Sequence, residues 1–392
     1  MGKLLPLPII AELCIISFLL LVLVKPNAAI SVVNFGAKPD GRTDSTQAFQ
    51  KAWASACSSA TPVTLDIPFG GFVVQPTSFT GPCKKQVTLR IKGTIMGPSD
   101  YRILAQNNVW LRFYNINGLT INGGTLDARG QSFWACRRGY GNCYKGAQSI
   151  TFVACTNVLV SGLKSINSQM SHMSVKSCDN VAFKYLTLLA SPESLNTDGI
   201  NVQHTNRLTI HGSVISTGDD CIALGPGTQN TVINKIACGP GHGISIGSMG
   251  NTLQEDGVEN VVVSNVGFWR TTNGVRIKSW ARPSNSFVRG ITFQNLVMYD
   301  VLNPILIDQK YCPSNKCPHE NSGVKISNVK YINVKGTSKT KEAIRFTCSP
   351  SNPCNGIKLK NIKLTFGKQP AITSCSDAHG SSRGIVNPRG CF

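Results

Sequence analysis

A short strand-like phrase recurs along the chain from about residue 150, and it constrains the fold more than any other feature. Each phrase is an alternating apolar run rich in Val and Ile, broken by Gly, Asn, Ser or Asp. Strands of this kind, bounded by turn residues and repeated every 23 to 34 residues, are typical of a solenoid. The phrases are NVLVSGL (157), NVAFKYL (180), RLTIHGS (207), NTVINKI (230), NVVVSNV (260), GITFQNL (290), VKISNVK (324) and GIKLKNI (356).

The strand content predicts an all-β fold, namely a right-handed parallel β-helix in which each repeat forms one coil. A propeller is disfavoured by the short and uneven spacing, and a β-sandwich by the number of repeats. Residues 35–57 predict a turn followed by a helix capped by Ser45 or Thr46, with Phe49 and Trp53 on one apolar face. Such a short N-terminal helix would cap the open end of the solenoid and protect its edge.

The first 29 residues have the features of a secretory signal peptide. Lys3 gives a positive start, residues 8–24 are mostly apolar, and small residues follow at 26–29. A transmembrane anchor is the alternative, but the apolar run is marginal in length and is followed by a small-residue cleavage site. We therefore expect a secreted protein without stable membrane insertion. No composition break marks a linker, so residues 30–392 are predicted to form a single domain.

The cysteine count agrees with an oxidising compartment. The chain has 15 cysteines, and an even number remains once Cys14 is removed with the signal peptide. No cysteine spacing is typical of a zinc site. Cys155 and Cys178 lie in apolar strand-like stretches and could equally be buried free thiols. The close pairs suggest six local bridges, which are Cys57/Cys83, Cys136/Cys143, Cys221/Cys238, Cys312/Cys317, Cys348/Cys354 and Cys375/Cys391.

The charge balance indicates an anionic partner. The chain has 39 Lys and Arg against 19 Asp and Glu, a formal net charge of +20. A surface of this charge attracts polyanions. Nucleic acid is one candidate, and an acidic polysaccharide is the other candidate for an exported protein.

Four polar positions fall into one column when the repeats are aligned. The segments TDGINV, DDCIAL, GHGISIG and TNGVRIKSW share a polar residue, then Gly or Cys, then an alternating run. The alignment steps are 22, 22 and 31 residues, about one coil each. Neighbouring parallel strands lie about 4.8 Å apart, so aligned side chains are close neighbours. The aligned residues are Asp198, Asp220, His242 and Asn273.

The column gathers groups suited to acid–base hydrolysis. Asp219 lies beside Asp220, and Arg276 and Lys278 follow on the next coil. Taken singly, these are ordinary turn or strand residues, but together they place three carboxylates, an imidazole and two cations on one strip. Glycoside hydrolysis needs a protonated acid and an ionised base. Two carboxylates could hold a water while the third reaches the glycosidic oxygen, which favours inversion at a carboxyl separation of about 6.5–9.5 Å.

At these residues the chain resembles the polygalacturonases, the pectin hydrolases of glycoside hydrolase family 28. The opening VVNFGAKPDGRTDSTQAF and the segment NPILIDQKYC are similar to the plant branch. The resemblance covers essentially the whole mature chain. The family's four marker motifs stand in order as Asn196-Thr-Asp198, Gly218-Asp-Asp220, Gly241-His-Gly243 and Arg276-Ile-Lys278.

The resemblance implies inverting hydrolysis of α-1,4-linked galacturonate in the cell wall, without a metal or another cofactor. It implies that the partner is pectin, an acidic polysaccharide, rather than nucleic acid, and we expect a monomer. The implied catalytic roles are a general acid (Asp219), a pair that activates water (Asp198 and Asp220) and a histidine that supports the acid's protonation state (His242). The implied substrate-binding residues are Arg276 and Lys278 for the sugar carboxylate, with Asn196 and Tyr311 completing the subsites.

Some positions depart from the usual plant pattern. Asn201 stands where a His is common, Leu195 where Pro is frequent, and Ser171 where a bulky aromatic is common. None of these removes an implied catalytic group. They affect the expected details of the subsites rather than the reaction.

Four other functions remain as alternatives. A pectate lyase would keep the β-helix but use bound calcium and a basic residue, and a related hydrolase would act on decorated pectin such as rhamnogalacturonan. A non-catalytic wall protein would bind pectin without cleaving it. Nucleic-acid binding is supported by the charge alone. The complete carboxylate column favours the hydrolase.

Overall fold

The computed structural model describes residues 28–139, 142–314, 316–317 and 320–392. Residues 1–27 of the expected signal peptide lie outside this part. The last two residues of that expected segment belong to the first strand, β1 (Ala28–Ser31), which pairs with β3 (Val63–Ile67). No helix in the described part of the chain is long and apolar enough to cross a membrane.

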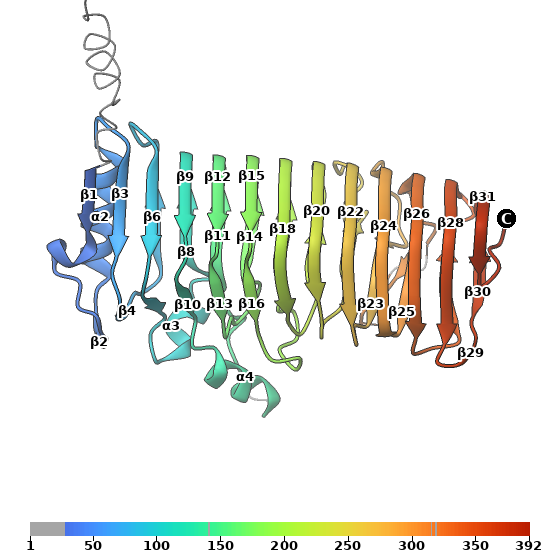
Figure 1. Cartoon of the computed structure of the whole chain (residues 1–392), viewed down its shortest axis with the longest axis horizontal. Helices are drawn as coiled ribbons and strands as arrows, with labels where there is room; N and C mark the ends of the chain where they lie inside the picture. Colours follow the sequence, from blue (N-terminus) through green and yellow to red (C-terminus); the bar gives the residue numbers. More distant parts are fainter. Residues whose placement is uncertain (1–27, 140–141, 315, 318–319) are drawn as a thin grey trace, which may run out of the picture.

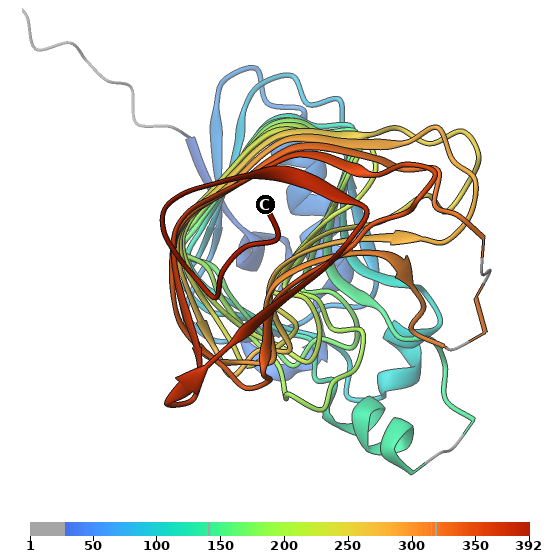
Figure 2. The same cartoon turned by 90° about the vertical axis from the view of Figure 1, so that its right-hand side faces the viewer.

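Parallel strands stack into coils along one axis, as Figure 1 shows from the side and Figure 2 along the axis. The strand ladders are parallel except for the short pairing of β28 with β29. Parallel strands joined by connections of this kind are right-handed in nearly all proteins. The predicted all-β fold, a right-handed parallel β-helix, is confirmed.

One face of the β-helix is an 11-stranded parallel sheet, here called the groove sheet because the candidate site lies on it. Its strands are short, and their side chains alternate between the core and the outer surface. Its members, in spatial order, are β5 (Thr77–Thr80), β8 (Val109–Tyr114), β11 (Gln148–Val153), β14 (Met173–Lys176), β17 (Ile200–Gln203), β19 (Ile222–Leu224), β21 (Ile244–Met249), β23 (Asn273–Trp280), β25 (Asn303–Tyr311), β27 (Glu342–Thr347) and β30 (Ile372–Ser376).

The remaining faces form a 20-stranded sheet, here called the back sheet, whose two ladders merge at β18 (Asn206–Ser216). The first ladder continues from β1 and β3 through β6 (Val87–Ile91), β9 (Asn117–Asn122), β12 (Thr156–Ser161) and β15 (Asp179–Lys184). The second contains β2 (Asp40–Asp44), β4 (Gly71–Val73), β7 (Thr94–Met96), β10 (Thr125–Asp127), β13 (Lys164–Ile166) and β16 (Thr187–Leu189). The merged ladder contains β20 (Gln229–Cys238), β22 (Val258–Trp269), β24 (Phe287–Val301), β26 (Lys325–Ser338), β28 (Cys354–Phe366) and β31 (Ala378–Asn387), with β29 (Gln369–Pro370) beside β28.

The core is filled by side chains that repeat at the same place in successive coils. Phe79, Phe113 and Phe152 form one such column on β5, β8 and β11, with ring centroids 5.0 and 5.5 Å apart, and Phe183 of β15 packs against Phe152 at 5.8 Å. These rings are nearly inaccessible to solvent. Each coil therefore buries its apolar face only because a neighbour covers it, as expected for a solenoid.

Asparagines hold the corners of the back sheet. Asn265, Asn295, Asn333 and Asn361 have φ between 54° and 56°, the left-handed region that Asn tolerates better than most residues. The Nδ2 of each of the last three donates to the Oδ1 of the asparagine one coil earlier, at 3.0 to 3.2 Å. The recurring Asn of the sequence phrases thus turns the chain and links neighbouring coils.

The predicted capping helix is α2 (Thr46–Cys57), which packs against the first coil at the N-terminal end (Figure 1). Its buried face includes Phe49 and Trp53, as expected. The capping residue differs from the prediction, because the backbone NH of Thr46 donates to Asp44 Oδ1 at 2.9 Å and Ser45 makes no side-chain capping bond. Three short helices were not predicted, the 3₁₀ helix η1 (Val32–Phe35), α3 (Tyr101–Ala105) and α4 (Gln131–Arg138).

All six predicted disulfides are confirmed. Cys155 and Cys178, whose state the sequence left open, are buried free thiols. Cys221–Cys238 joins the start of β19 to the end of β20, so it staples the groove sheet to the back sheet beside the candidate site.

Candidate active site

The predicted column of polar residues is confirmed by the strand register. Ile200, Ile222, Ile244 and Val275 are partners on β17, β19, β21 and β23. Two positions before each of them, on consecutive coils, stand the aligned residues Asp198, Asp220, His242 and Asn273.

The backbone at the start of each strand is tightly packed, which explains the glycines there. The NH of Gly199 donates to the carbonyl of Asp220 at 2.9 Å, and the NH of Cys221 donates to the carbonyl of Gly243 at 2.7 Å. A Cβ on Gly243 would lie 2.0 Å from the carbonyl oxygen of Asn273, and its φ is +85°. Only glycine fits this position without a shift of the backbone. The packing fixes where the neighbouring carboxylates and imidazole emerge.

Asp220 is the centre of a buried ion cluster and is only 2% exposed. Its Oδ1 accepts from Arg276 Nη2 at 3.0 Å and from Ser245 Oγ at 2.8 Å, while its Oδ2 accepts from Lys278 Nζ at 2.9 Å. The same Ser245 Oγ accepts from Arg276 Nε at 3.0 Å. Both oxygens of the carboxylate are therefore engaged, and its charge is matched by two cations.

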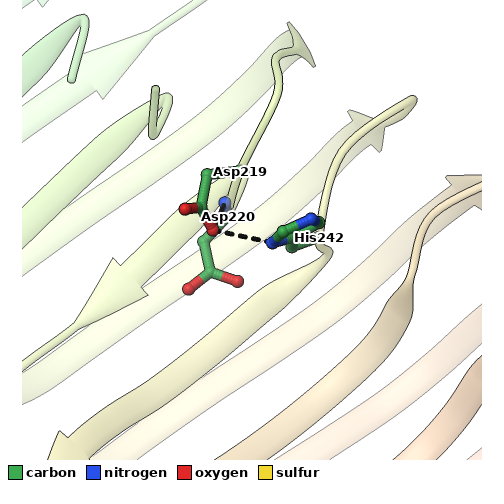
Figure 3. A group of neighbouring side chains, drawn as sticks. All are labelled: Asp219, Asp220 and His242. Atoms are coloured by element: carbon green, nitrogen blue, oxygen red, sulfur yellow. Dashed lines mark hydrogen bonds and ion pairs between the residues drawn. The ribbon is translucent and has the colours of Figure 1, made fainter. Parts of the chain in front are cut away.

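Asp219 and His242 form a second pair, shown in Figure 3. His242 Nδ1 lies 2.8 Å from Asp219 Oδ1. Burial alone would raise the pKa of Asp219, but the hydrogen bond and charge of His242 outweigh it, so this pKa is lowered. The hydrogen bond to Asp219 raises the pKa of His242. In the unliganded site the pair thus favours a carboxylate beside an imidazolium.

Asp198 has the opposite tendency. Burial, followed by the negative charges of Asp220 and Asp219, raises the pKa of Asp198 above its ordinary value. Asn201 Nδ2 donates to Asp198 Oδ2 at 2.9 Å and, like the charge of Lys278, favours the ionised form. The carboxyl group with the raised pKa is therefore Asp198, whereas the pKa of the implied acid Asp219 is lowered.

A surface cavity of about 390 Å³ opens over these groups. Lys278 reaches it from the C-terminal side, and Gln148, Met170 and Ser171 lie along the N-terminal side. Arg276 and His242 lie outside its lining. The predicted site residues that line the cavity are Asn196, Asp198, Asp219, Asp220, Lys278 and Tyr311.

Tyr311 lies over the two cations. Lys278 Nζ is 5.1 Å and Arg276 Cζ is 5.7 Å from the centre of its ring, and Trp280 packs against the ring at 5.3 Å. A cation over an aromatic face at this distance is attracted by the ring quadrupole. Tyr311 therefore helps to hold the cations that face Asp220.

Arg276 differs from its predicted role in one respect. We expected its guanidinium to bind a substrate carboxylate, but in this structure it is directed at Asp220 and Ser245. Two contacts were missed, those of Asn201 and Ser245. The repeat alignment already contained the signal, because a second column lies three residues after the first and consists of Asn201, Ala223, Ser245 and Arg276.

The compact acid–imidazole cluster also has the residue types of a metal site. Asp219, Asp220 and His242 each offer one ligand atom, and these atoms lie within 4.8 Å of one another. The fit is poor on chemical grounds, because Lys278 and Arg276 already engage both oxygens of Asp220. A divalent cation would have to displace them and would be repelled by their charges.

Comparison with known proteins places these residues in a family. The chain matches Glycosyl hydrolases family 28 over residues 57–385. It is 49% identical to a polygalacturonase of Prunus persica over 365 residues, which is 92% of this chain and 93% of the relative. It is 38% identical to an exopolygalacturonase of Platanus acerifolia, over 92% of this chain and 97% of the relative.

Solved structures share the fold. An endo-xylogalacturonan hydrolase from Aspergillus tubingensis has a TM-score of 0.81 at 21% identity, covering 92% of this chain and 100% of that protein. Endopolygalacturonase I from Stereum purpureum, solved with two galacturonates, has a TM-score of 0.62 at 23% identity, covering 83% of this chain and 95% of that protein.

Proposed function

The chain belongs to glycosyl hydrolases family 28, and we infer that it is a polygalacturonase, which hydrolyses the α-1,4 linkages between galacturonic acid residues of pectin. The observation that carries this inference is the cavity into which three carboxylates converge from two consecutive coils, with Lys278 in its lining and Arg276 bonded to Asp220 outside the lining. A basic protein with such a cavity is suited to an acidic polysaccharide.

The base is formed by Asp198 and Asp220. Asp220 is held as a carboxylate by Arg276 and Lys278, and Asp198 lines the same cavity one coil away. A water held between the two loses a proton to one carboxylate as its oxygen bonds to the anomeric carbon. Attack from the face opposite the leaving group inverts the configuration at that carbon.

The acid is Asp219, which gives its proton to the glycosidic oxygen as the bond from that oxygen to the anomeric carbon breaks. Asp219 favours the ionised form in the unliganded site, so the proton must be supplied. His242 Nδ1 lies 2.8 Å from Asp219 Oδ1 and is the natural donor. His242 is therefore a positioning and proton-supplying residue outside the cavity lining.

Substrate carboxylates are bound by the positive flank of the cavity. Lys278 lines the cavity and has a second NH available beyond its bond to Asp220. Arg276 stabilises the anionic site through Asp220, and Tyr311 and Asn196 line the wall that a sugar ring would contact. The reaction needs no metal, since the two cations already supply the positive charge.

The setting of the reaction follows from the same features. We propose that the protein is secreted and acts in the cell wall as a monomer, with residues 30–392 as one catalytic domain. Six disulfides support an oxidising compartment, and plant polygalacturonases are its relatives.

The test is a time course on de-esterified polygalacturonate with the wild type and Asp219→Asn. We expect the wild type to release reducing ends and the variant to lose at least about 10²-fold in kcat. NMR of the first product should show the inverted anomer. Unsaturated product and loss of activity with a chelator would instead identify a lyase, and binding without product would identify a non-catalytic wall protein.

A further inference from the structure

Three back-sheet strands at the C-terminal end of the β-helix, β26, β28 and β31, carry cations on their outer surface (right-hand end of Figure 1). They are exposed residues of a sheet that does not line the catalytic cavity. The cationic face is defined as Lys330, Lys335, Lys358, Lys360, Lys363 and Arg383.

The cations begin abruptly along the sheet. The column that contains Lys330 and Lys358 has neutral residues, Val232, Val262 and Thr292, on the three preceding strands. The two neighbouring columns change in the same way. In one of these columns, the neutral residues Asn234, Ser264 and Gln294 are followed on the next strands by Ile332, Lys360 and Arg383. In the other column, the neutral residues Ala237, Gly267 and Val297 are followed by Lys335 and Lys363.

Within the cationic face, like charges are direct neighbours. The strand register pairs Lys330 with Lys358, Lys335 with Lys363, and Lys360 with Arg383. Like charges directly opposite each other destabilise a sheet. Selection for the stability of the fold alone would disfavour this arrangement, so the like-charge pairs point to a function.

Elsewhere on the same sheet, arginines are paired with acids on the adjacent strand. Arg90 Nε lies 2.8 Å from Asp66, and Arg289 Nε lies 2.6 Å from Glu259. In the described part of the chain, by contrast, no ion pair joins a cation of the cationic face to a carboxylate. These charges are therefore available to an external anion.

A shallow hollow of about 370 Å³ lies within the cationic face. Its walls include Lys330, Lys358, Lys360 and Arg383, and its floor includes the side chain of Ile332. Cations around a partly apolar floor suit a ligand with both carboxylates and the apolar face of a sugar ring.

We propose that the cationic face is a second binding site for acidic polysaccharide, separate from the catalytic cavity and able to hold a polygalacturonate chain while the cavity cleaves it. The choice of this polymer rests on the proposed function. A chain with one carboxylate per sugar can engage cations spaced about 4.8 Å across strands and about 6.6 Å along a strand. Binding at two sites of one protein multiplies the retention on a long polymer.

Nucleic acid is the less suitable polyanion. Among the residues that the structure describes, no aromatic side chain lines the hollow, whereas single-stranded nucleic acid is usually held by stacking of its bases on aromatics. A polysaccharide needs no such platform. A single-stranded DNA probe serves as the arm of the test that distinguishes the two.

The test combines four substitutions in the Asp219→Asn background, Lys330→Gln, Lys358→Gln, Lys360→Gln and Arg383→Gln. The matched control carries Lys38→Gln, Lys51→Gln, Lys84→Gln and Lys85→Gln, which remove the same charge from exposed positions at the other end. Retention on immobilised polygalacturonate is measured across a salt series. We expect the cationic-face variant to lose on the order of tenfold in retention and the control less than about twofold.

A second measurement separates this inference from the proposed function. The same four cationic-face substitutions with Asp219 intact should cleave a short galacturonate oligomer at the wild-type rate, since that substrate reaches only the cavity. Equal loss of retention in both sets of variants would overturn the second site and attribute binding to net charge. Loss of DNA retention alone would also overturn it. A wild type that does not cleave the oligomer would refute the proposed function instead.

Discussion

The two charged regions of this protein are built in opposite ways. In the active site, Asp220 is 2% exposed and its charge is matched by Arg276 and Lys278 at hydrogen-bonding distance. On the cationic face, Lys330 and Lys358 are exposed, adjacent and without an acid partner. Both regions use a ladder of parallel strands, one in the groove sheet and one in the back sheet, to bring side chains of successive coils together. The difference shows that one fold can hold charges in fixed pairs for catalysis or leave them unpaired, where they can attract an external anion.

The difference has a physical consequence. Buried charges in low dielectric interact strongly, and removal of one member leaves the others uncompensated. Exposed charges act through solvent, so their effects are small, additive and screened by salt. Substitutions should therefore have large and specific effects in the active site and small and graded effects on the cationic face.

The largest effect is expected for Asp220→Ala. Arg276 and Lys278 would lose their common partner and remain largely buried, which should cost about 3 kcal/mol of the free energy of unfolding. Activity on polygalacturonate should also be lost. Urea denaturation and reducing-end release measure the two effects. Lys358→Ala is the control from the cationic face, and an equal loss of stability in both variants would contradict the contrast.

An intermediate effect is expected for Asn201→Leu, which removes the hydrogen bond that favours ionised Asp198. Burial already raises the pKa of Asp198, and loss of this bond should raise that pKa further. A base works only when ionised, so the acid limb of kcat/KM should move to higher pH. The bond is worth about 1 kcal/mol, which corresponds to less than about one pH unit.

The control for this prediction is Ser174→Ala, one coil away in the same column as Asn201. It should leave the pH profile of kcat/KM unchanged. If Asn201→Leu lowered kcat uniformly at every pH, the residue would act on packing rather than on the protonation of Asp198.

The smallest effect is expected for Lys358→Glu. The substitution replaces the like-charge contact with Lys330 by an opposite-charge contact, so the free energy of unfolding should rise by about 0.5 kcal/mol at low salt. The gain should shrink as salt screens the pair. Urea denaturation at two salt concentrations measures it. A loss of stability would mean that the lysines are held by contacts other than their charges.

The sequence predicted those parts of the fold that repeat. The Val- and Ile-rich phrases predicted the coils, and the short cysteine separations predicted all six disulfides. The aligned glycines placed Asp198, Asp220 and His242 in one column because parallel strands keep their register. Where a feature recurs in every coil, one alignment fixes many positions at once.

Features that occur once were not predicted. Helix α4 spans eight residues outside the repeats, and its few apolar residues gave no helical period. The choice of Asp44 over Ser45 as the capping acceptor depends on side-chain direction. The contacts of Arg276 with Asp220 and Ser245 were not predicted, because a strip of charges does not tell which charges satisfy each other. That balance depends on burial, which only the packed coils define.

The register of the coils also makes the spacing of the site residues in space independent of the number of residues in each coil. The steps between aligned residues are 22, 22 and 31 residues, yet β17, β19, β21 and β23 remain consecutive in one sheet. Eight of the nine extra residues of the last step lie between Ile244 and Val261, in the longer β21 and in residues 250–257 that connect it to β22. Turns of the β-helix can thus become longer or shorter, or be exchanged, during evolution while the catalytic groups keep their mutual spacing. The walls of the groove can therefore differ between related proteins that catalyse the same reaction.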